Sequence, residues 1–215
     1  KETFSIFGDP FSISAMSFIK NSKDKNNIII YHYPTLFSLI YIILWLRNNL
    51  TILVYHSDVT KFKIFKPLID LHLKLLNIFV DKYYISSSLY LKNSNIKNFY
   101  EKTIQEYFSI NLKRNYLKRD YKIPFKKYVI FIGKDRHYKG FEYLEKIISL
   151  NQDVNFVCIT DHNMVLKKNL KIFSHIDENF KKYLIKNAEI LISTSNSKSE
   201  SYGINLLEGL FYNKP

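Results

Sequence analysis

The stretch Glu200-Ser-Tyr-Gly-Ile-Asn-Leu-Leu-Glu208 places two carboxylates eight positions apart, with a single glycine, Gly203, between them. Before it, residues 188–193 (AEILIS) are apolar and bounded by polar residues, which predicts a short buried strand. After it, apolar residues recur at helical spacing and predict a helix that begins near Gly203: Leu206, Leu207, Leu210 and Phe211. In an open parallel sheet, ligands bind beyond the carboxyl end of a strand, so this segment is a candidate site.

A helix that begins near Gly203 suits an anion. Its first backbone N–H groups are unpaired and carry a partial positive charge, and glycine lets the backbone approach the anion closely. Glu208 would lie about 7–8 Å along the helix from Gly203, whereas Glu200 stays at the mouth of the loop. Carboxylates accept hydrogen bonds from hydroxyls, so a diphosphate at the helix start could carry sugar rings to both glutamates. Taken alone, such a pair is more often two solvated carboxylates on a surface helix.

Short apolar segments alternate with helical ones along the chain, which predicts an α/β fold with parallel sheets. The predicted strands are residues 1–6, 27–31, 51–55, 82–86, 127–132, 154–159, 172–173 and 188–193. The predicted helices include residues 10–20, 36–46, 61–80 and 179–187. The apolar run at 36–46 is much shorter than the roughly 20 residues needed to cross a bilayer, so a buried helix is expected there.

The chain has 215 residues, one cysteine and a formal net charge of +13. The charge favours anionic partners, namely nucleic acid, nucleotide phosphates or a membrane surface, but a compositional bias from an AT-rich genome explains it equally well. The single cysteine, Cys158, excludes an internal disulfide, favours a reducing cytosol and is expected in the core. The sequence has no Gly-x-Gly-x-x-Gly segment, no Walker loop and no Cys/His metal spacing, so no protein-bound metal is expected.

Residues 61–80 form a basic, amphipathic segment with two interpretations. Lysines at positions 61, 63, 66 and 74 alternate with apolar residues. One interpretation is a helix with an apolar face on the core and a solvated basic face. The other is a helix that contacts anionic lipid headgroups, as basic amphipathic helices do.

Four segments resemble the motifs of one enzyme family, the retaining glycosyltransferases of family 4. ESYGINLLEGLFYNKP at residues 200–215 resembles that family's E-x-F-G-x-x-x-x-E-(A/G)-x-x-x-x-x-P motif. Tyr55-His-Ser-Asp58 resembles its W-H-S-D motif, and Gly133-Lys-Asp-Arg-His-Tyr-Lys-Gly140 resembles its G-R-x-x-x-x-K-G donor loop. Residues 107–111 (YFSIN) occupy the place of its interdomain P-x-G-x-D.

The resemblance covers essentially the whole chain and implies the GT-B fold, in which two Rossmann-like domains face a cleft. The domains would be residues 1–111 on the acceptor side and 127–215 on the nucleotide-sugar side. A polar, basic stretch at 112–126, which contains Pro124, is the predicted linker. Both domains are expected to be incomplete, as in a fragment that lacks both ends of a longer enzyme.

The resemblance also implies roles for individual residues. His56 would face the donor sugar and Glu200 would orient its hydroxyls, and these two are the catalytic candidates. The resemblance implies that six residues bind the donor: Lys134, Lys139, Gly203, Ile204, Asn205 and Glu208. The lysines and the helix amides would contact the leaving phosphates, and Glu208 would contact the ribose. Lys134 stands where the family has arginine. The lysine keeps the positive charge but lacks the bidentate hydrogen-bonding geometry of arginine.

The implied activity is metal-independent transfer of a hexosyl-type sugar from a nucleotide-diphosphate donor to a glycan or lipid-linked acceptor, with retention of configuration, in cell-surface polysaccharide synthesis. No cofactor is implied, because the nucleotide sugar is a substrate. The expected location is the cytoplasm, peripheral on the inner face of the membrane, with an anionic membrane surface as a further partner and nucleic acid disfavoured. The alternative is a non-catalytic basic module for nucleic acid or anionic membrane, whose binding would weaken steeply with salt.

Overall fold

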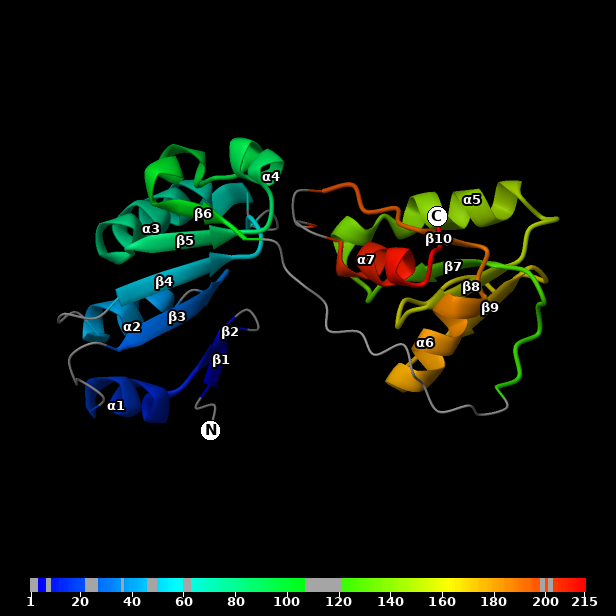
Figure 1. Cartoon of the computed structure of the whole chain (residues 1–215), viewed down its shortest axis with the longest axis horizontal. Coiled ribbons are helices and arrows are strands. Elements are labelled where there is room, and N and C mark those ends of the chain that lie inside the picture. The colour runs from blue at the N-terminus through cyan, green and yellow to red at the C-terminus, as the bar shows by residue number, and fades with distance from the viewer. Residues whose placement is uncertain are drawn as a thin grey trace. The chain divides into compact units, whose positions relative to one another are not determined.

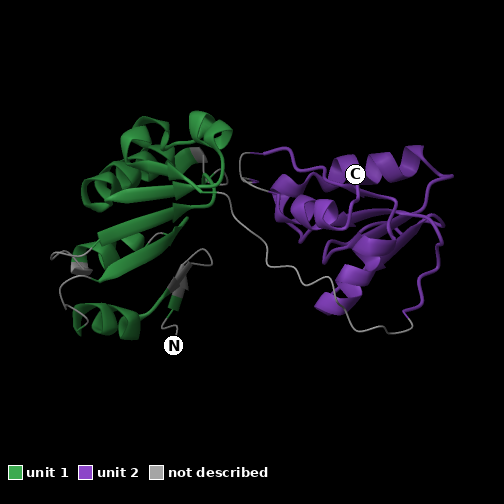
Figure 2. Cartoon of the chain, viewed as in Figure 1, with its two compact units in different colours: residues 1–108 green, residues 109–215 purple. Residues whose placement is uncertain are grey.

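The computed structural model describes residues 4–6, 9–21, 27–35, 37–45, 50–59, 63–106, 121–197, 200 and 203–215. The chain divides into two compact units, Lys1–Phe108 and Ser109–Pro215 (Figure 2). The motif predicted at residues 107–111 and most of the linker predicted at 112–126 lie outside the described residues. The predicted domain boundaries therefore stay a prediction.

Unit 1 is built on a four-stranded parallel sheet in the order β3-β4-β5-β6 (Figure 1). Its strands are β3 (Ile28–Tyr33), β4 (Leu50–Tyr55), β5 (Lys82–Ile85) and β6 (Thr103–Gln105). Its α-helices are α1 (Ile13–Asn21), α2 (Ser38–Trp45), α3 (Lys66–Phe79) and α4 (Ser88–Asn93), with 3₁₀ turns η1 (Lys63–Phe65) and η2 (Lys97–Lys102). The predicted alternation of strand and helix in a parallel sheet is confirmed.

A short antiparallel hairpin of β1 (Phe4–Ile6) and β2 (Asp9–Phe11) precedes α1. The sequence predicted a helix from residue 10, which was wrong for residues 10–12. Phe11 stacks on Phe4 with the ring centroids 4.8 Å apart, and its ring also lies 4.8 Å from that of Phe37. Since Phe37 lies far away in the sequence, local periodicity could not have revealed this packing.

The two faces of the unit 1 sheet differ. One face packs against α2 and α3 in a buried cluster that includes Tyr31, Tyr33, Ile42, Leu53, Tyr55, Leu73 and Leu76. Alternate residues of a strand point to opposite faces. On the other face, Ile28, Ile30 and Leu50 are 60%, 55% and 41% exposed. Ile52, on the same face, is only 8% exposed, so the exposure is confined to part of a face that parallel sheets usually have covered.

Unit 2 is a second four-stranded parallel sheet, in the order β10-β7-β8-β9. Its strands are β7 (Val129–Ile132), β8 (Phe156–Ile159), β9 (Leu170–Phe173) and β10 (Ile190–Ile192). The helices are η3 (His137–Lys139), α5 (Phe141–Leu150), α6 (Glu178–Asn187) and α7 (Ile204–Phe211). Because β10 pairs with β7 in parallel, the loops that follow these two strands meet at one edge of the sheet.

Both faces of the unit 2 sheet are covered. Residues of α5 pack on one face with Phe131 and Cys158, and residues of α6 pack on the other with Ile130 and Val157. Cys158 is fully buried, as predicted, and burial raises the pKa of its thiol to about 12. None of the helices in the described ranges has both the length and the hydropathy of a membrane span.

Candidate functional site

The α7 helix begins at the predicted glycine. Gly203 precedes the first helical residue, Ile204, and its backbone lies in the left-handed region, with φ 63° and ψ 55°. Glycine adopts this conformation without a steric penalty. The N–H of Leu206 donates to the Gly203 carbonyl at 2.8 Å, so the N–H groups of Ile204 and Asn205 precede the first helical bond. The backbone geometry of a helix N-terminus is therefore present at this position.

The predicted donor loop, residues 133–140, follows β7 and contacts the loop that follows β10. The Thr194 hydroxyl donates to the Lys139 carbonyl at 2.7 Å, and the Asn196 N–H donates to the Tyr138 carbonyl at 3.1 Å. Gly140 has φ 64°, and a Cβ atom there would lie only 2.1 Å from the Thr194 carbonyl oxygen. The two loops are thus held together by contacts that require glycine at position 140.

Lys139 and Glu200 form an ion pair across these loops. The Lys139 Nζ lies 2.5 Å from the Glu200 Oε2, and the two side chains are 13% and 24% exposed. The Ser195 hydroxyl donates to the same carboxylate oxygen at 3.1 Å. The sequence singled out both residues but did not foresee this contact, because the contact depends on β10 lying beside β7. Partial burial makes the pair electrostatically stronger than one in bulk water.

Glu208 is a buried residue within unit 2. Its Oε1 lies 2.8 Å from the Nζ of Lys181, which also lies 3.1 Å from Glu178. Burial alone would lower the pKa of Lys181, but hydrogen bonds and the charges of the two glutamates outweigh it and raise the pKa. The other oxygen of Glu208, Oε2, is buried and has no hydrogen-bond partner among the described residues. Its lone pairs are therefore unsatisfied within the described residues.

Sequence reasoning missed Lys181, the partner of Glu208. Its only local signal is the Glu178–Lys181 spacing on one helix face, which is common on solvated helices. Lys181 is only 19% exposed on its side chain. Its role is to compensate the buried charge of Glu208.

Asn205 anchors the start of α7. Its side-chain amide donates to the Ile132 carbonyl, the last residue of β7, at 2.8 Å. A donor-binding role for Asn205 would therefore fall to its backbone N–H. Lys134 and the side chain of Ile204 are exposed. Within unit 2 the structure thus brings together Lys139 and Glu200, and ties α7 to the end of β7.

His56 belongs to unit 1, at the carboxyl end of β4. Its Nε2 lies 2.7 Å from the Nδ1 of His32, which comes from the neighbouring strand β3. The rings are nearly parallel, with centroids 5.0 Å apart. Burial and, second, the charge of His32 lower the pKa of His56. The sequence assigned no role to His32, which directly follows the predicted strand at residues 27–31.

Asp58 fixes the loop that follows His56. Its Oδ1 accepts hydrogen bonds from the Tyr55 hydroxyl at 2.5 Å and from the Asn95 N–H at 3.0 Å, and its own N–H donates to the Tyr90 hydroxyl at 2.7 Å. Its side chain is buried. Asp58 is therefore a structural residue in unit 1, and it positions the segment that carries His56.

The described residues contain no group of three or more His, Cys, Asp and Glu side chains that could hold a metal ion. The predicted cleft between the two units, which would bring His56 near the unit 2 residues, stays a prediction.

Two sugar transferases are similar to the chain in sequence, although no protein-family model matches it. It is 24% identical over 229 residues to D-rhamnosyltransferase WbpZ of Pseudomonas aeruginosa, covering 95% of the chain and 58% of that protein. It is also 24% identical over 237 residues to O-antigen chain mannosyltransferase C of Escherichia coli, covering 100% of the chain and 62% of that protein. The chain thus spans about three fifths of the length of these relatives.

The fold is similar to that of solved glycosyltransferase structures. HepE of Anabaena, solved in complex with UDP and glucose, matches with a TM-score of 0.67 and 15% identity, over 94% of the chain and 60% of HepE. These similar structures are GT-B proteins with Rossmann-like domains. The predicted α/β fold with two Rossmann-like units is thereby confirmed.

Proposed function

We propose that the protein is a GT-B glycosyltransferase of family 4, which moves a hexosyl-type sugar from a nucleotide-diphosphate donor to a glycan or lipid-linked acceptor with retention of configuration. The observation that carries the proposal is the Lys139–Glu200 ion pair, which joins the two predicted donor motifs at one edge of the unit 2 sheet. The two relatives that are named sugar transferases support the same activity. The O-antigen relative supports a role in cell-surface polysaccharide synthesis.

In this proposal unit 2 holds the donor. The Lys139 ammonium and the N–H groups at the start of α7 neutralise the diphosphate, which accumulates charge as it leaves. Lys134, exposed on the same loop, adds a second cation. The unpartnered Oε2 of Glu208 accepts a hydrogen bond from a ribose hydroxyl. The complex of HepE with UDP and glucose supports a nucleotide-diphosphate sugar as donor.

The chemical step needs no nucleophile from the protein. The bond between the sugar carbon and the phosphate oxygen breaks, and the acceptor hydroxyl attacks the same face of the sugar. The leaving phosphate takes the proton of that hydroxyl, which balances the step. Glu200 orients the sugar hydroxyls. His56 is hydrogen-bonded to His32 and its pKa is lowered, so it approaches the sugar as a mainly neutral imidazole near pH 7. No cofactor or metal is invoked, and the cytoplasm, where nucleotide sugars are available, is the proposed location.

The decisive experiment incubates the full-length protein with a panel of UDP-, GDP- and dTDP-sugars and a lipid-linked acceptor extract. We expect transfer from one donor, with the product's anomeric configuration, read by NMR, equal to that of the donor. Inversion would overturn the retaining mechanism alone. A folded protein that binds no nucleotide and transfers no sugar, but binds DNA in a steeply salt-dependent way, would support the basic binding module instead.

A further inference from the structure

The α3 helix exposes a continuous stripe of apolar side chains. Leu68, Leu71, Leu75 and Ile78 recur three or four residues apart, the spacing of one helix face, and are 62%, 52%, 37% and 68% exposed. The stripe continues into the preceding turn η1, where Ile64 and Phe65 are 91% and 51% exposed. Single exposed leucines are ordinary, whereas an aligned run of this length indicates an interaction surface.

This stripe is separate from the core-facing side of the helix. Leu73 and Leu76, which pack into the unit 1 core, are 2% and 0% exposed. The helix therefore has two apolar faces, one buried and one exposed. A core helix with a solvated polar side, one of the two interpretations of the sequence, does not account for the second face.

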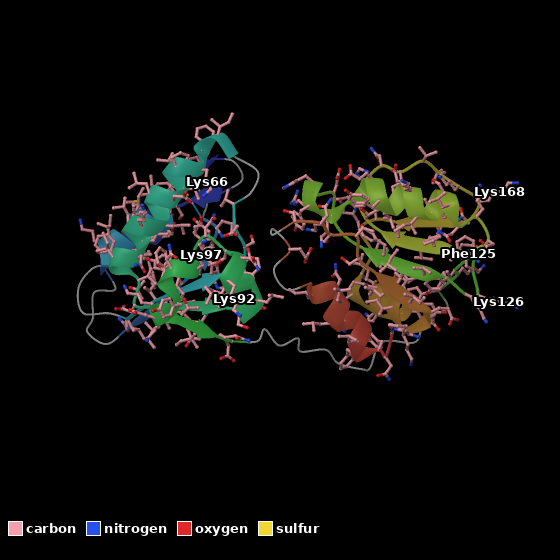
Figure 3. All side chains as sticks on the ribbon, turned by 90° about the horizontal axis from the view of Figure 1, so that it is seen from above. Lys66, Lys92, Lys97, Phe125, Lys126 and Lys168 are labelled. Atoms are coloured by element: carbon pink, nitrogen blue, oxygen red, sulfur yellow. The ribbon has the colours of Figure 1, made fainter. Side chains whose placement is uncertain are left out.

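One lysine borders the exposed stripe, and two more lie at the ends of the helix. Lys74 is exposed and lies three positions from Leu71 and four from Ile78, so it neighbours both on the helix surface. Lys66, labelled in Figure 3, lies at the start of the helix, and Lys82 is exposed just beyond its end. The helix has one acidic residue, Asp70, which forms an ion pair with Lys66 at 2.8 Å.

Neighbouring helices add to the same chemistry. α2 packs beside α3 and exposes Ile40 and Ile43 to 42% and 48%, and α1 exposes Phe18 to 71% and has an exposed Lys20 in its last turn. An apolar surface with a lysine beside it and further lysines near by matches an anionic bilayer, whose acyl boundary takes the apolar side chains while its headgroups attract the lysines.

We propose that the exposed face of α3, formed by Ile64, Phe65, Leu68, Leu71, Leu75 and Ile78 with Lys74 beside it, docks unit 1 onto an anionic lipid bilayer. The helix lies in the plane of the interface and does not cross the membrane. The inference extends the proposed function, because a lipid-linked acceptor would be presented at that surface. It does not depend on sugar transfer, because membrane binding is measured without donor or acceptor.

The test measures co-sedimentation of the full chain with vesicles of phosphatidylglycerol and phosphatidylcholine in equal parts, and with phosphatidylcholine alone. We expect binding to the anionic vesicles that weakens as salt rises. The double variant Leu71→Gln/Ile78→Gln keeps the charge and good helix formers, and should lower the partition coefficient by at least about tenfold. Lys74→Gln should lower it by about threefold or more at low salt.

The matched control is Val165→Gln/Leu166→Gln in unit 2, which removes two apolar side chains that are 74% and 78% exposed. It should bind vesicles like the unmodified chain. Circular dichroism checks that each variant is folded, and Lys74→Gln still decides the question if the double variant unfolds. The proposal is overturned if the unmodified chain ignores anionic vesicles, if Lys74→Gln binds as the unmodified chain does, or if the α3 and control variants bind alike. A dimer that the α3 variant dissociates, without vesicle binding, would assign the surface to a second copy.

Discussion

The Nδ1 atom of His32 lies 2.7 Å from the Nε2 atom of His56, so the imidazoles at the ends of β3 and β4 are hydrogen-bonded to each other. Such a contact requires one protonated and one unprotonated nitrogen, which a doubly charged pair cannot supply. Burial and the charge of His32 both lower the pKa of His56. The pair thus favours a neutral His56 near pH 7.

Replacing His32 by asparagine tests how the pair works. The His32→Asn variant keeps an amide close to the position of Nδ1 and removes the titratable charge. We expect the pKa of His56 to rise, yet to stay below its ordinary value of about 6.5, because burial persists. NMR titration of the His56 ring protons measures both points. An unchanged pKa would remove His32 from the account, and a pKa above the ordinary value would contradict the effect of burial.

The same lowered pKa predicts how stability depends on pH. In the window between the folded pKa of His56 and its unfolded value of about 6.5, the unfolded chain binds more protons than the folded chain. The free energy of unfolding should therefore rise with pH through this window and fall as the solution is acidified. Urea unfolding between about pH 5 and about pH 7 checks the sign. In His56→Gln the slope should be smaller, and an equal slope would assign the effect to other groups.

Lys139→Ala tests the donor loop. Turnover should fall by about 10²–10³-fold, the usual loss for one donor to a charged transition state. The free energy of unfolding should fall by only about 1 kcal/mol, because Glu200 keeps its hydrogen bond from Ser195 and some solvent contact. Lys146→Ala, on the exposed side of α5, is the matched control and should change neither. Full turnover with a lowered melting temperature would make Lys139 a structural residue.

The two glutamates should differ when each is changed to glutamine. Glu208→Gln should mainly raise the KM for the donor, because the proposed function places Glu208 on the ribose, which does not change during the reaction, so that the contact is uniform binding. Glu200→Gln should mainly lower kcat, since the proposed function places Glu200, which pairs with Lys139, at the sugar hydroxyls near the reacting carbon. Steady-state kinetics separates the two effects. Near-normal kinetics in both would discard the site, and equal losses of kcat would discard only the division of roles.

The two left-handed glycines should tolerate alanine unequally. At Gly140, with φ 64°, the new Cβ would lie 2.1 Å from a backbone oxygen, so Gly140→Ala should cost more than about 3 kcal/mol. At Gly203, with φ 63°, the nearest atom is the flexible Leu206 Cδ1 at 3.1 Å, so Gly203→Ala should cost about 1–2 kcal/mol. Urea unfolding of the two variants measures the order. Equal losses would mean that the Thr194 loop yields easily.

Local patterns in the sequence predicted the features that depend on neighbouring residues. The strand–loop–glycine–helix order around Gly203 follows from periodicity and from the one residue type that accepts a left-handed backbone, and the structure has it. Ser87 is the N-cap of α4 and accepts the N–H of Tyr90, as serine commonly does at a helix start. The parallel sheets follow from alternating apolar strands and helices.

Features that depend on residues far apart in the sequence could not be predicted from local patterns. The Lys139–Glu200 contact requires β10 to pair with β7, and nothing local encodes that order. His32 meets His56 only because β3 and β4 pair in one register. Lys181 matters only because α7 places Glu208 beside it. In residues 61–80, Lys63–Phe65 is a separate 3₁₀ turn, and α3 begins at Lys66 with Pro67 in its first turn.

The contact between Glu200 and Lys139 also sets a condition on whatever anion reaches the loop. The Lys139 ammonium has three N–H donors and Glu200 takes one of them at 2.5 Å, so an anion that takes this donor must displace a carboxylate of the same chain. A singly charged ion gains too little binding energy to displace the carboxylate, whereas a diphosphate that also contacts the start of α7 gains several contacts at once. The displaced carboxylate can then accept a hydrogen bond from a hydroxyl group. Binding of the phosphate and recognition of the sugar would thus be coupled through this one ion pair.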